Sequence, residues 1–318
     1  GGPMSTDDVS GVVANLREWL IDRTDSEQTK GLLSVGTTVL FLTTFYVVPL
    51  GLLFLFSFMT DIKLGEITLT LESYKRVLGI EAILAGNFAG ATYLQLLLKS
   101  LRVSIIVTLA SLAISYPITY YIGQRAPRKY KTAMVMLVII PFWTSYLIRT
   151  YAWIPIISES GIINTALATV GLPKVQLLYT SFATTLGLVY VYLPFMILPL
   201  YASMEKLDPS LVEAAQDLGA GRIRVFYEVI FPLTLPGAVA GSIFIFIKCA
   251  AAFITPTLLG GSNGTLYATV IVNQFRDVFN WNFGSALSFV LLAVIMLILW
   301  MGMRTGYLSE TGAIGGGQ

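Results

Sequence analysis

The sequence predicts an all-α membrane protein with six membrane-spanning helices. Of its 318 residues, 55% are apolar and only 12% are Asp, Glu, Lys or Arg. That charged share is about half of what an ordinary soluble domain carries. A bilayer core takes about 20 apolar residues as an α-helix, and several stretches reach that length. The expected spans are residues 32–59, 96–123, 132–157, 177–204, 233–259 and 284–303.

Charged residues help to locate the first two spans. The first lies in the stretch between Lys30 and Asp61, which has no charged residue, and the second carries Lys99 and Arg102 near its start. Prolines lie in or near most spans, where neighbouring helices can satisfy the freed carbonyls, so we expect kinks rather than breaks. These prolines are Pro49, Pro117, Pro141, Pro194, Pro199 and Pro256.

The composition excludes several classes of protein. Twenty basic residues against 18 acidic ones give a net charge of +2, without the excess typical of nucleic-acid binding. There is no histidine, and Cys249 is the single cysteine, which we expect to be an inert buried thiol. An intrachain disulfide, a histidine-activated nucleophile and most metal sites are therefore excluded, and we expect no metal or bound cofactor.

The two ends are set apart from the six-span domain, residues 32–304. Gly1 to Pro3 ahead of Met4 is typical of a tag-cleavage scar. The rest of 1–31 has apolar residues at helical spacing, which predicts an amphipathic helix that lies on the cytoplasmic bilayer face or docks a partner subunit. Residues 305–318 are expected to form a flexible cytoplasmic tail.

The basic residues predict the orientation. With the N-terminus inside, the cytoplasmic segments carry 11 Lys and Arg residues and the outside segments carry five. The strongest contribution comes from the acid-free stretch 125–131 between the second and third spans. The positive-inside bias thus predicts a multi-pass protein of the inner membrane with both termini in the cytoplasm.

The spans lack acidic side chains. None of the six expected spans contains Asp or Glu, whereas proton- and sodium-coupled carriers usually hold their coupling ion with such groups. The chain also lacks the G-x-x-x-x-G-K-[ST] loop that binds nucleotides. Energy for active transport would therefore come from outside this chain, while a simple pore or autonomous carrier stays open at this point.

Residues 205–232 predict a compact helical element on the cytoplasmic face. Asp208 is an N-cap residue with Pro209 at the first helical position, and Gly219 is placed to end the helix in the left-handed conformation. A second amphipathic segment follows and is expected to be stopped by Pro232 and Pro236. Such an element can transmit motion to or from another protein.

The same segment resembles a known signature. Glu213-Ala214-Ala215, followed by Gly219 and Pro232, is similar to the EAA motif of permease subunits of ABC importers, although Val229 and Phe231 stand where that family usually has Ile and Leu. In the family this motif forms a coupling helix that docks on an ATP-hydrolysing subunit. The resemblance implies a coupling role for Glu213, Ala214, Ala215, Asp217, Gly219, Gly221 and Pro232.

Further segments extend the resemblance to about residues 33–304. Residues 140–153 and 190–202 look like signatures of spermidine/putrescine-type permeases, and 258–261 and 280–284 also fit. This implies the type I ABC importer permease fold and a small polar organic solute, most simply a polyamine. It implies as partners a second permease, two ATPase subunits that hold ATP and Mg²⁺, and an extracytoplasmic solute-binding protein, so that this chain is not itself an enzyme.

Aromatic and basic residues are the candidates for the substrate pathway or gate. Arg149 lies about 27 Å along a straight third span at 1.5 Å per residue, near the outer membrane edge. Tyr146, Arg149 and Trp153 would share one helix face, either as membrane anchors or as substrate contacts. The full candidate set is Trp143, Tyr146, Arg149, Tyr151, Trp153, Tyr192, Lys248 and Phe253.

The fifth span departs from the family pattern. Where relatives of the polyamine type often read F-x-P-x-x-G-E-F, Lys248 replaces the proline, Ala251 the glycine and Ala252 the glutamate. A lysine inside a span lines a wet cavity, finds a partner or reaches the interface. Its positive charge suits an anionic or zwitterionic solute, such as an opine, a phosphonate or an amino-acid derivative, so this alternative stands beside the polyamine.

Overall fold

The computed structural model describes residues 27–59 and 69–304, with side chains over 35–59 and 69–302. The chain divides into two compact units, residues 1–56 and 57–318. Apart from one isolated bridge between Met59 and Leu69, the regular structure of the described residues is helical. The expected amphipathic helix before residue 27 and the tail after residue 304 lie outside the described residues.

The described part of the first unit consists of α2 (Glu27–Leu42), the π-turn η1 (Thr43–Val47) and α3 (Val48–Ser57) up to the unit boundary. Residues Val35–Ser57 form a 23-residue helix that is long and apolar enough to cross a membrane. Its large apolar side chains are exposed within the unit, as expected of a helix that faces lipid or another apolar surface. The first predicted span is confirmed.

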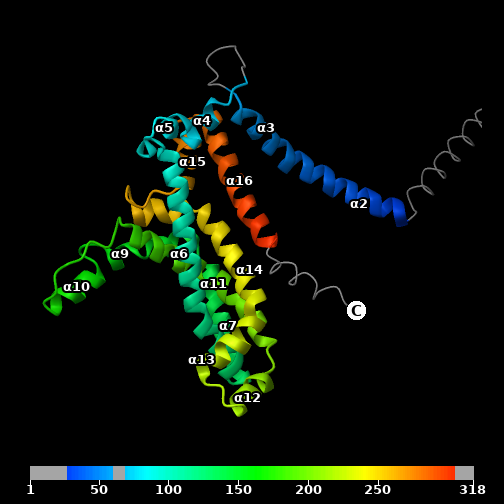
Figure 1. The fold of residues 1–318 in the computed structure, drawn as a ribbon, viewed down its shortest axis with the longest axis vertical. Helices are drawn as coiled ribbons and strands as arrows, with labels where there is room; N and C mark the ends of the chain where they lie inside the picture. Colours follow the sequence, from blue (N-terminus) through cyan, green and yellow to red (C-terminus); the bar gives the residue numbers. More distant parts are fainter. Residues whose placement is uncertain (1–26, 60–68, 305–318) are drawn as a thin grey trace, which may run out of the picture. The chain divides into compact units, whose positions relative to one another are not determined.

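The second unit is built around three long helices that run side by side (Figure 1): α6 (Thr92–Tyr120), α11 (Ser181–Glu205) and α14 (Phe231–Ala250). Their shared core contains Val107, Leu188, Met196, Ile245 and Cys249, each fully buried. Small residues bring the helices close, since a Cβ on Gly241 would lie 2.7 Å from the sulfur of Met196. Cys249 is thus the buried free thiol that the sequence predicted.

Shorter helices cover the two ends of this bundle. At one end, α4 (Glu72–Leu78) and α15 (Tyr267–Arg276) pack on α16 (Trp281–Arg304), and α12 (Pro209–Asp217) lies at the other end (Figure 1). The remaining helical segments are α5 (Ile80–Leu84), η2 (Phe88–Gly90), η3 (Tyr121–Arg125), α7 (Arg128–Ile139), η4 (Ile140–Trp143), α8 (Tyr146–Tyr151), α9 (Ile154–Ile157), α10 (Ile162–Thr169), α13 (Arg222–Val225), η5 (Phe226–Ile230) and η6 (Pro256–Gly260).

The third span differs from its prediction. Instead of one kinked helix over 132–157, two helical segments, 128–143 and 146–169, meet at 97°. The cause is local: Pro141 opens a short 3₁₀ turn, and Thr144 and Ser145 then adopt extended backbone, which ends the α-helical hydrogen bonding. The straight-helix estimate that placed Arg149 about 27 Å along this span is therefore wrong.

The fifth span also has different ends. A single helical run extends from Arg222 to Ala250, so Pro232 and Pro236 do not stop the second amphipathic segment as predicted. The π-turn η5 directly precedes Pro232. Its wider backbone accommodates the proline, whose nitrogen cannot donate a helical hydrogen bond, without ending the helix. At the other end, the helix stops at Ala250 rather than at residue 259. With the bent pair counted once, six spans result, and the predicted all-α, six-span class is confirmed.

Candidate coupling element and substrate pathway

The helix α12 begins with the predicted cap. A carboxylate oxygen of Asp208 accepts a hydrogen bond of 2.9 Å from the backbone N–H of Ser210, and Pro209 occupies the first turn. The backbone N–H of Ser210 lowers the pKa of Asp208, and the Ser210 side chain acts in the same direction. The cap predicted from the sequence is confirmed.

The end of α12 is a Schellman turn. Gly219 has φ of +83°, in the left-handed region that disfavours side chains. Its N–H donates to the carbonyl of Gln216 at 2.9 Å, and the N–H of Ala220 donates to that of Ala215 at 3.0 Å. The predicted left-handed glycine is confirmed, and it turns the chain sharply into α13.

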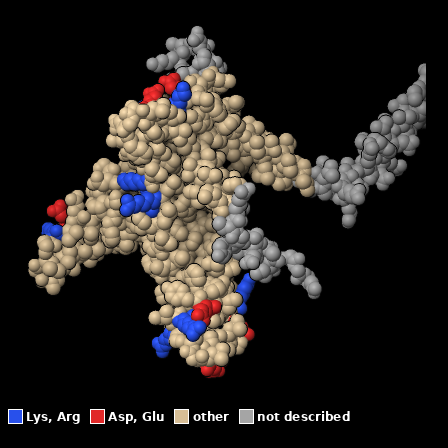
Figure 2. Space-filling view, in the orientation of Figure 1, with Lys and Arg blue, Asp and Glu red and all other residues tan. Residues whose placement is uncertain are grey.

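The tip of this element is exposed. The motif residues Glu213, Ala214, Asp217, Gly219, Gly221 and Pro232 are exposed and Ala215 is half-buried. Two apolar side chains that sequence reasoning missed stand among them, with Leu218 at 89% and Ile223 at 76% exposure. Figure 2 shows acidic and basic side chains gathered at this end of the bundle. A mixed apolar and charged surface of this kind is suited to docking another protein.

The inner side of the element is tied to the bundle. Val212 and Ala215 pack against a buried cluster that includes Leu200, Met204 and Val225. The side-chain amide of Gln124 in η3, which directly follows α6, donates to the carbonyls of Met204 at 2.8 Å and Leu207 at 3.3 Å, and so joins η3 to the end of α11. These contacts connect α12 and the loop before it to the long helices of the bundle.

Aromatic contacts make the same connection to the start of α14. The ring of Tyr116 on α6 meets the ring of Phe226 edge-on with centroids 5.3 Å apart and stacks on Phe231 at 5.9 Å. The Tyr116 hydroxyl also lies 3.2 Å from the hydroxyl of Thr234. Phe231 and Val229, the two departures from the family motif, pack against this cluster and retain an apolar contact.

A second candidate site is an aromatic cluster built from three spans. Phe142 meets Phe195 edge-on at 4.9 Å, and Phe195 stacks on Phe244 at 6.0 Å with 7° between the planes. Tyr146 stacks on Tyr192 at 6.5 Å. Phe142, Phe195 and Phe244 were not predicted, because their contacts join residues far apart in the sequence and leave no local signal.

Two cations lie on the faces of these rings. The guanidinium carbon of Arg149 lies 5.6 Å from the ring centroid of Phe142, and the Nζ of Lys248 lies 5.7 Å from that of Phe195. The Nε of Arg149 is buried without a hydrogen-bond partner among the described residues. The Tyr192 hydroxyl donates to the Lys248 carbonyl at 3.2 Å, and the Tyr146 hydroxyl lies 2.7 Å from that of Thr255.

The structure therefore groups only some of the predicted gate residues. Tyr146, Arg149, Tyr192 and Lys248 belong to the aromatic cluster. Trp153 lies after the end of α8, and its ring centroid is 5.4 Å from that of Tyr190. It therefore does not share one helix face with Tyr146 and Arg149. The remaining candidates, Trp143, Tyr151 and Phe253, are exposed.

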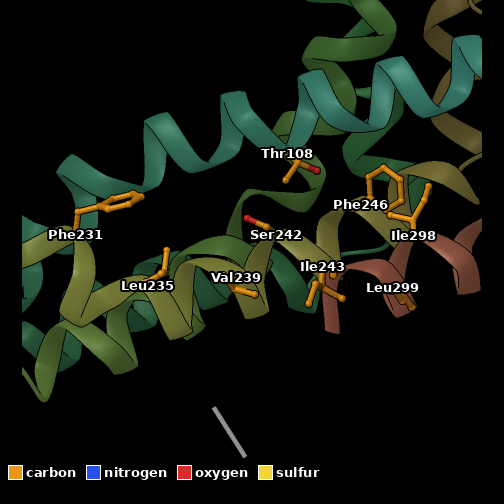
Figure 3. Close-up of a pocket in the computed structure, with 10 residues that line it drawn as sticks. Thr108, Phe231, Leu235, Val239, Ser242, Ile243, Phe246, Ile298 and Leu299 are labelled. Atoms are coloured by element: carbon orange, nitrogen blue, oxygen red, sulfur yellow. The ribbon is translucent and has the colours of Figure 1, made fainter. Parts of the chain in front are cut away.

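A pocket of about 540 Å³ lies elsewhere in the bundle (Figure 3). It is lined by α6, α14 and α16, and its side chains are apolar except for Thr108 and Ser242. No predicted gate residue lines it. Without a charged group, this pocket is poorly suited to a small polar solute, and it fits an apolar chain or helix better.

An apolar helical bundle with an exposed, rigidly attached helix at one end has the features of a transport permease. The chain belongs to the family described as "Binding-protein-dependent transport system inner membrane component", whose model matches residues 29–305. It is therefore a multi-pass inner-membrane subunit of an ABC importer, in a family that is not itself enzymatic. The importer assignment predicted from the EAA-like motif is confirmed.

Curated relatives and solved structures agree with this assignment. The chain is 36% identical over 255 residues to the spermidine/putrescine transport system permease protein PotB of Escherichia coli K12, covering 78% of this chain and 88% of the relative. The Haemophilus influenzae protein of the same name is 40% identical over 224 residues, covering 70% and 78%. A bacterial alginate ABC transporter shares the fold, with a TM-score of 0.64, 17% identity and coverage of 90% and 93%.

Proposed function

We propose that this chain is the permease subunit of an ATP-driven importer that carries polyamines of the spermidine and putrescine type. The observation that carries the proposal is the 36% identity, over 255 residues, to a permease named for these two solutes. The similarity spans nearly all of the six-span domain rather than one motif. It therefore supports a shared pathway as well as a shared fold.

The transport cycle that we propose uses α12 as its coupling element. Two partner ATPase subunits bind ATP and Mg²⁺, and their closure moves α12 through contacts with Glu213, Asp217 and the exposed Leu218. The Schellman turn at Gly219 and the contacts of Gln124 pass this movement to α6 and α11. A second permease subunit completes the pathway, and an extracytoplasmic binding protein delivers the solute.

The proposal includes domain limits and an orientation. Residues 32–304 form the permease domain, with the coupling segment at 205–232 and both termini in the cytoplasm. The basic stretch 125–131 then lies on the same side as α12, and it includes Lys131, whose ammonium donates to the carbonyl of Gly123.

An anionic or zwitterionic solute is the second candidate. The positive charges of Arg149 and Lys248 in the aromatic cluster favour it. The polyamine is preferred because relatives that cover most of the chain are named for it. Aromatic faces also attract ammonium groups without any carboxylate.

Uptake by the complete importer tests the proposal. The chain is expressed with its cognate partner subunits in a bacterial strain that lacks its own polyamine uptake, and entry of radiolabelled spermidine, putrescine and glutamate is measured. We expect ATP-dependent uptake of the two polyamines and none of glutamate. Uptake of glutamate alone would establish the second candidate, and solute flux through this chain without partners would indicate an autonomous carrier.

A further inference from the structure

The stacked rings of Phe195 and Phe244 offer a face to a cation. Their centroids are 6.0 Å apart with planes 7° from parallel, and they join α11 to α14. Phe195 is half-buried and Phe244 is 55% exposed within this chain. The face of a benzene ring carries partial negative charge, and a cation within about 6 Å of its centroid is attracted.

The cation on this platform belongs to the protein. The Nζ of Lys248 lies 5.7 Å from the centroid of Phe195. Phe244 and Lys248 are four residues apart on α14 and therefore share a helix face. The Tyr192 hydroxyl holds the backbone carbonyl of Lys248 at 3.2 Å, while the Lys248 side chain is exposed. The base of this side chain is thus fixed, and its end is free to change rotamer.

The lysine side chain has the chemistry of the proposed substrate. It is a four-carbon chain that ends in a primary ammonium group. Putrescine is a four-carbon chain with such a group at each end, and spermidine contains the same aminobutyl segment. Lys248 therefore holds, on the ring of Phe195, a covalently attached copy of one end of a polyamine.

Two ammonium groups cannot share this platform. Like charges a few ångströms apart repel each other, and no ion pair of Lys248 with an acidic side chain occurs among the described residues to offset its charge. A substrate ammonium that reaches the ring must displace the lysine, whose stem allows it to swing away. The tethered group thus competes with the substrate for the ring.

We propose that the Phe195–Phe244 pair is a binding subsite for a primary ammonium group of the substrate, and that Lys248 occupies it when substrate is absent. This inference rests on the proposed polyamine function. An internal competitor weakens binding along the pathway, which favours onward release of a solute that the binding protein has already selected.

Direct binding tests the subsite. The permease and ATPase subunits are assembled in lipid nanodiscs without the binding protein, so that calorimetry reports the Kd of spermidine for the membrane site. If the lysine leaves the ring free in about one fifth of the molecules, the apparent Kd is raised about fivefold. Lys248→Met keeps a flexible apolar side chain without the charge, and we expect it to lower the Kd about fivefold.

Two further variants separate the subsite from a general effect of charge. Lys99→Met removes another lysine from a span, one whose ammonium donates to the Asn263 carbonyl at 2.7 Å, and should leave the Kd unchanged. Phe195→Leu keeps an apolar side chain but removes the ring face. In that background, Lys248→Met should no longer tighten binding.

The outcomes distinguish this inference from the proposed function. For an importer that takes up polyamines in cells, three results would overturn the subsite. The first is an unchanged or higher Kd in Lys248→Met, and the second is an equal gain in affinity from Lys248→Met in the Phe195→Leu background. The third is no measurable spermidine binding by either wild type or Lys248→Met. Failure of the wild-type importer to take up polyamines in cells would instead overturn the proposed function, and the subsite with it.

Discussion

Replacing Gly219 by alanine tests the Schellman turn that ends α12. At φ of +83°, a Cβ raises the backbone energy by about 1–2 kcal/mol. The built Cβ would meet no atom within 4 Å, so no steric clash adds to this cost. We therefore expect the turn to open more often, and about 1–2 kcal/mol corresponds to a roughly 5- to 30-fold increase in the open population.

Gly221→Ala is the matched comparison. Gly221 lies in the same loop and is likewise exposed, and its Cβ would also meet no atom within 4 Å, but its φ is −68°. Both substitutions reduce the conformational freedom of the unfolded chain equally. The difference between their effects therefore measures the cost of placing a side chain on the left-handed backbone of residue 219. Gly219→Asn should fall between the two, since asparagine tolerates this conformation better than alanine.

Hydrogen–deuterium exchange of the nanodisc complex measures the effect. The amides of Gly219 and Ala220 donate the two hydrogen bonds of the turn, so their exchange reports its opening directly. We expect both amides to exchange about 5- to 30-fold faster in Gly219→Ala than in Gly221→Ala. Equal exchange rates in the two variants would refute the assignment of strain to Gly219.

Three other predictions concern the same end of the molecule. Glu213→Ala should reduce uptake while the partner subunits continue to hydrolyse ATP, and Glu159→Ala, which also removes an exposed glutamate, should not; undiminished uptake in Glu213→Ala would contradict the coupling role. Gln124→Leu removes two side-chain hydrogen bonds to the end of α11 and should destabilise the protein by about 1–3 kcal/mol in thermal unfolding, more than Gln95→Leu, which removes one exposed bond. The Asp208 cap has a lowered pKa, so its stabilising effect should be complete above the usual carboxyl pKa and disappear as the pH falls through the lowered value. Exchange of the Ser210 amide, corrected for the intrinsic pH dependence of amide exchange, measures this effect. Loss of the amide's protection already near neutral pH, as the pH is lowered, would be inconsistent with the prediction.

Local signals predicted the caps and the spans well. Asp208, Pro209 and Gly219 act through bonds to neighbours within a few residues, so their positions alone predict α12 and its turn. Apolar runs of sufficient length likewise predict membrane helices, because the bilayer requires every backbone group to be satisfied within the helix. Neither inference depends on tertiary contacts.

The interruptions of the helices were harder to predict. Pro141 and Pro232 look alike in the sequence, yet the first lies at a 97° break and the second lies within a continuous helix. The difference depends on whether the neighbouring backbone forms a π-turn or becomes extended. Because membrane spans tolerate proline, we expected a kink at Pro141. The sequence around Pro141 gave no signal that predicted a break.

The aromatic cluster shows a different limit. Lys248 was recognised as unusual from the sequence, but its position over Phe195 depends on how α11 packs against α14. No spacing rule connects residues that are 53 positions apart in the chain. The charge of Lys248 alone therefore suggested an anionic solute, whereas its contact with the ring supports its role as a substitute for an ammonium group.

The π-turn η5 has a consequence for the direction in which α14 faces. It accommodates one residue more than an α-helical turn, and each residue of an α-helix advances the side-chain direction by about 100°. A chain lacking this extra residue would point every side chain after Ile230 about a quarter-turn away from its present direction. Phe244 and Lys248 would then leave the face that meets Phe195 while α12 stayed in place. The one extra residue in η5 thus decides which surface of α14 faces α11.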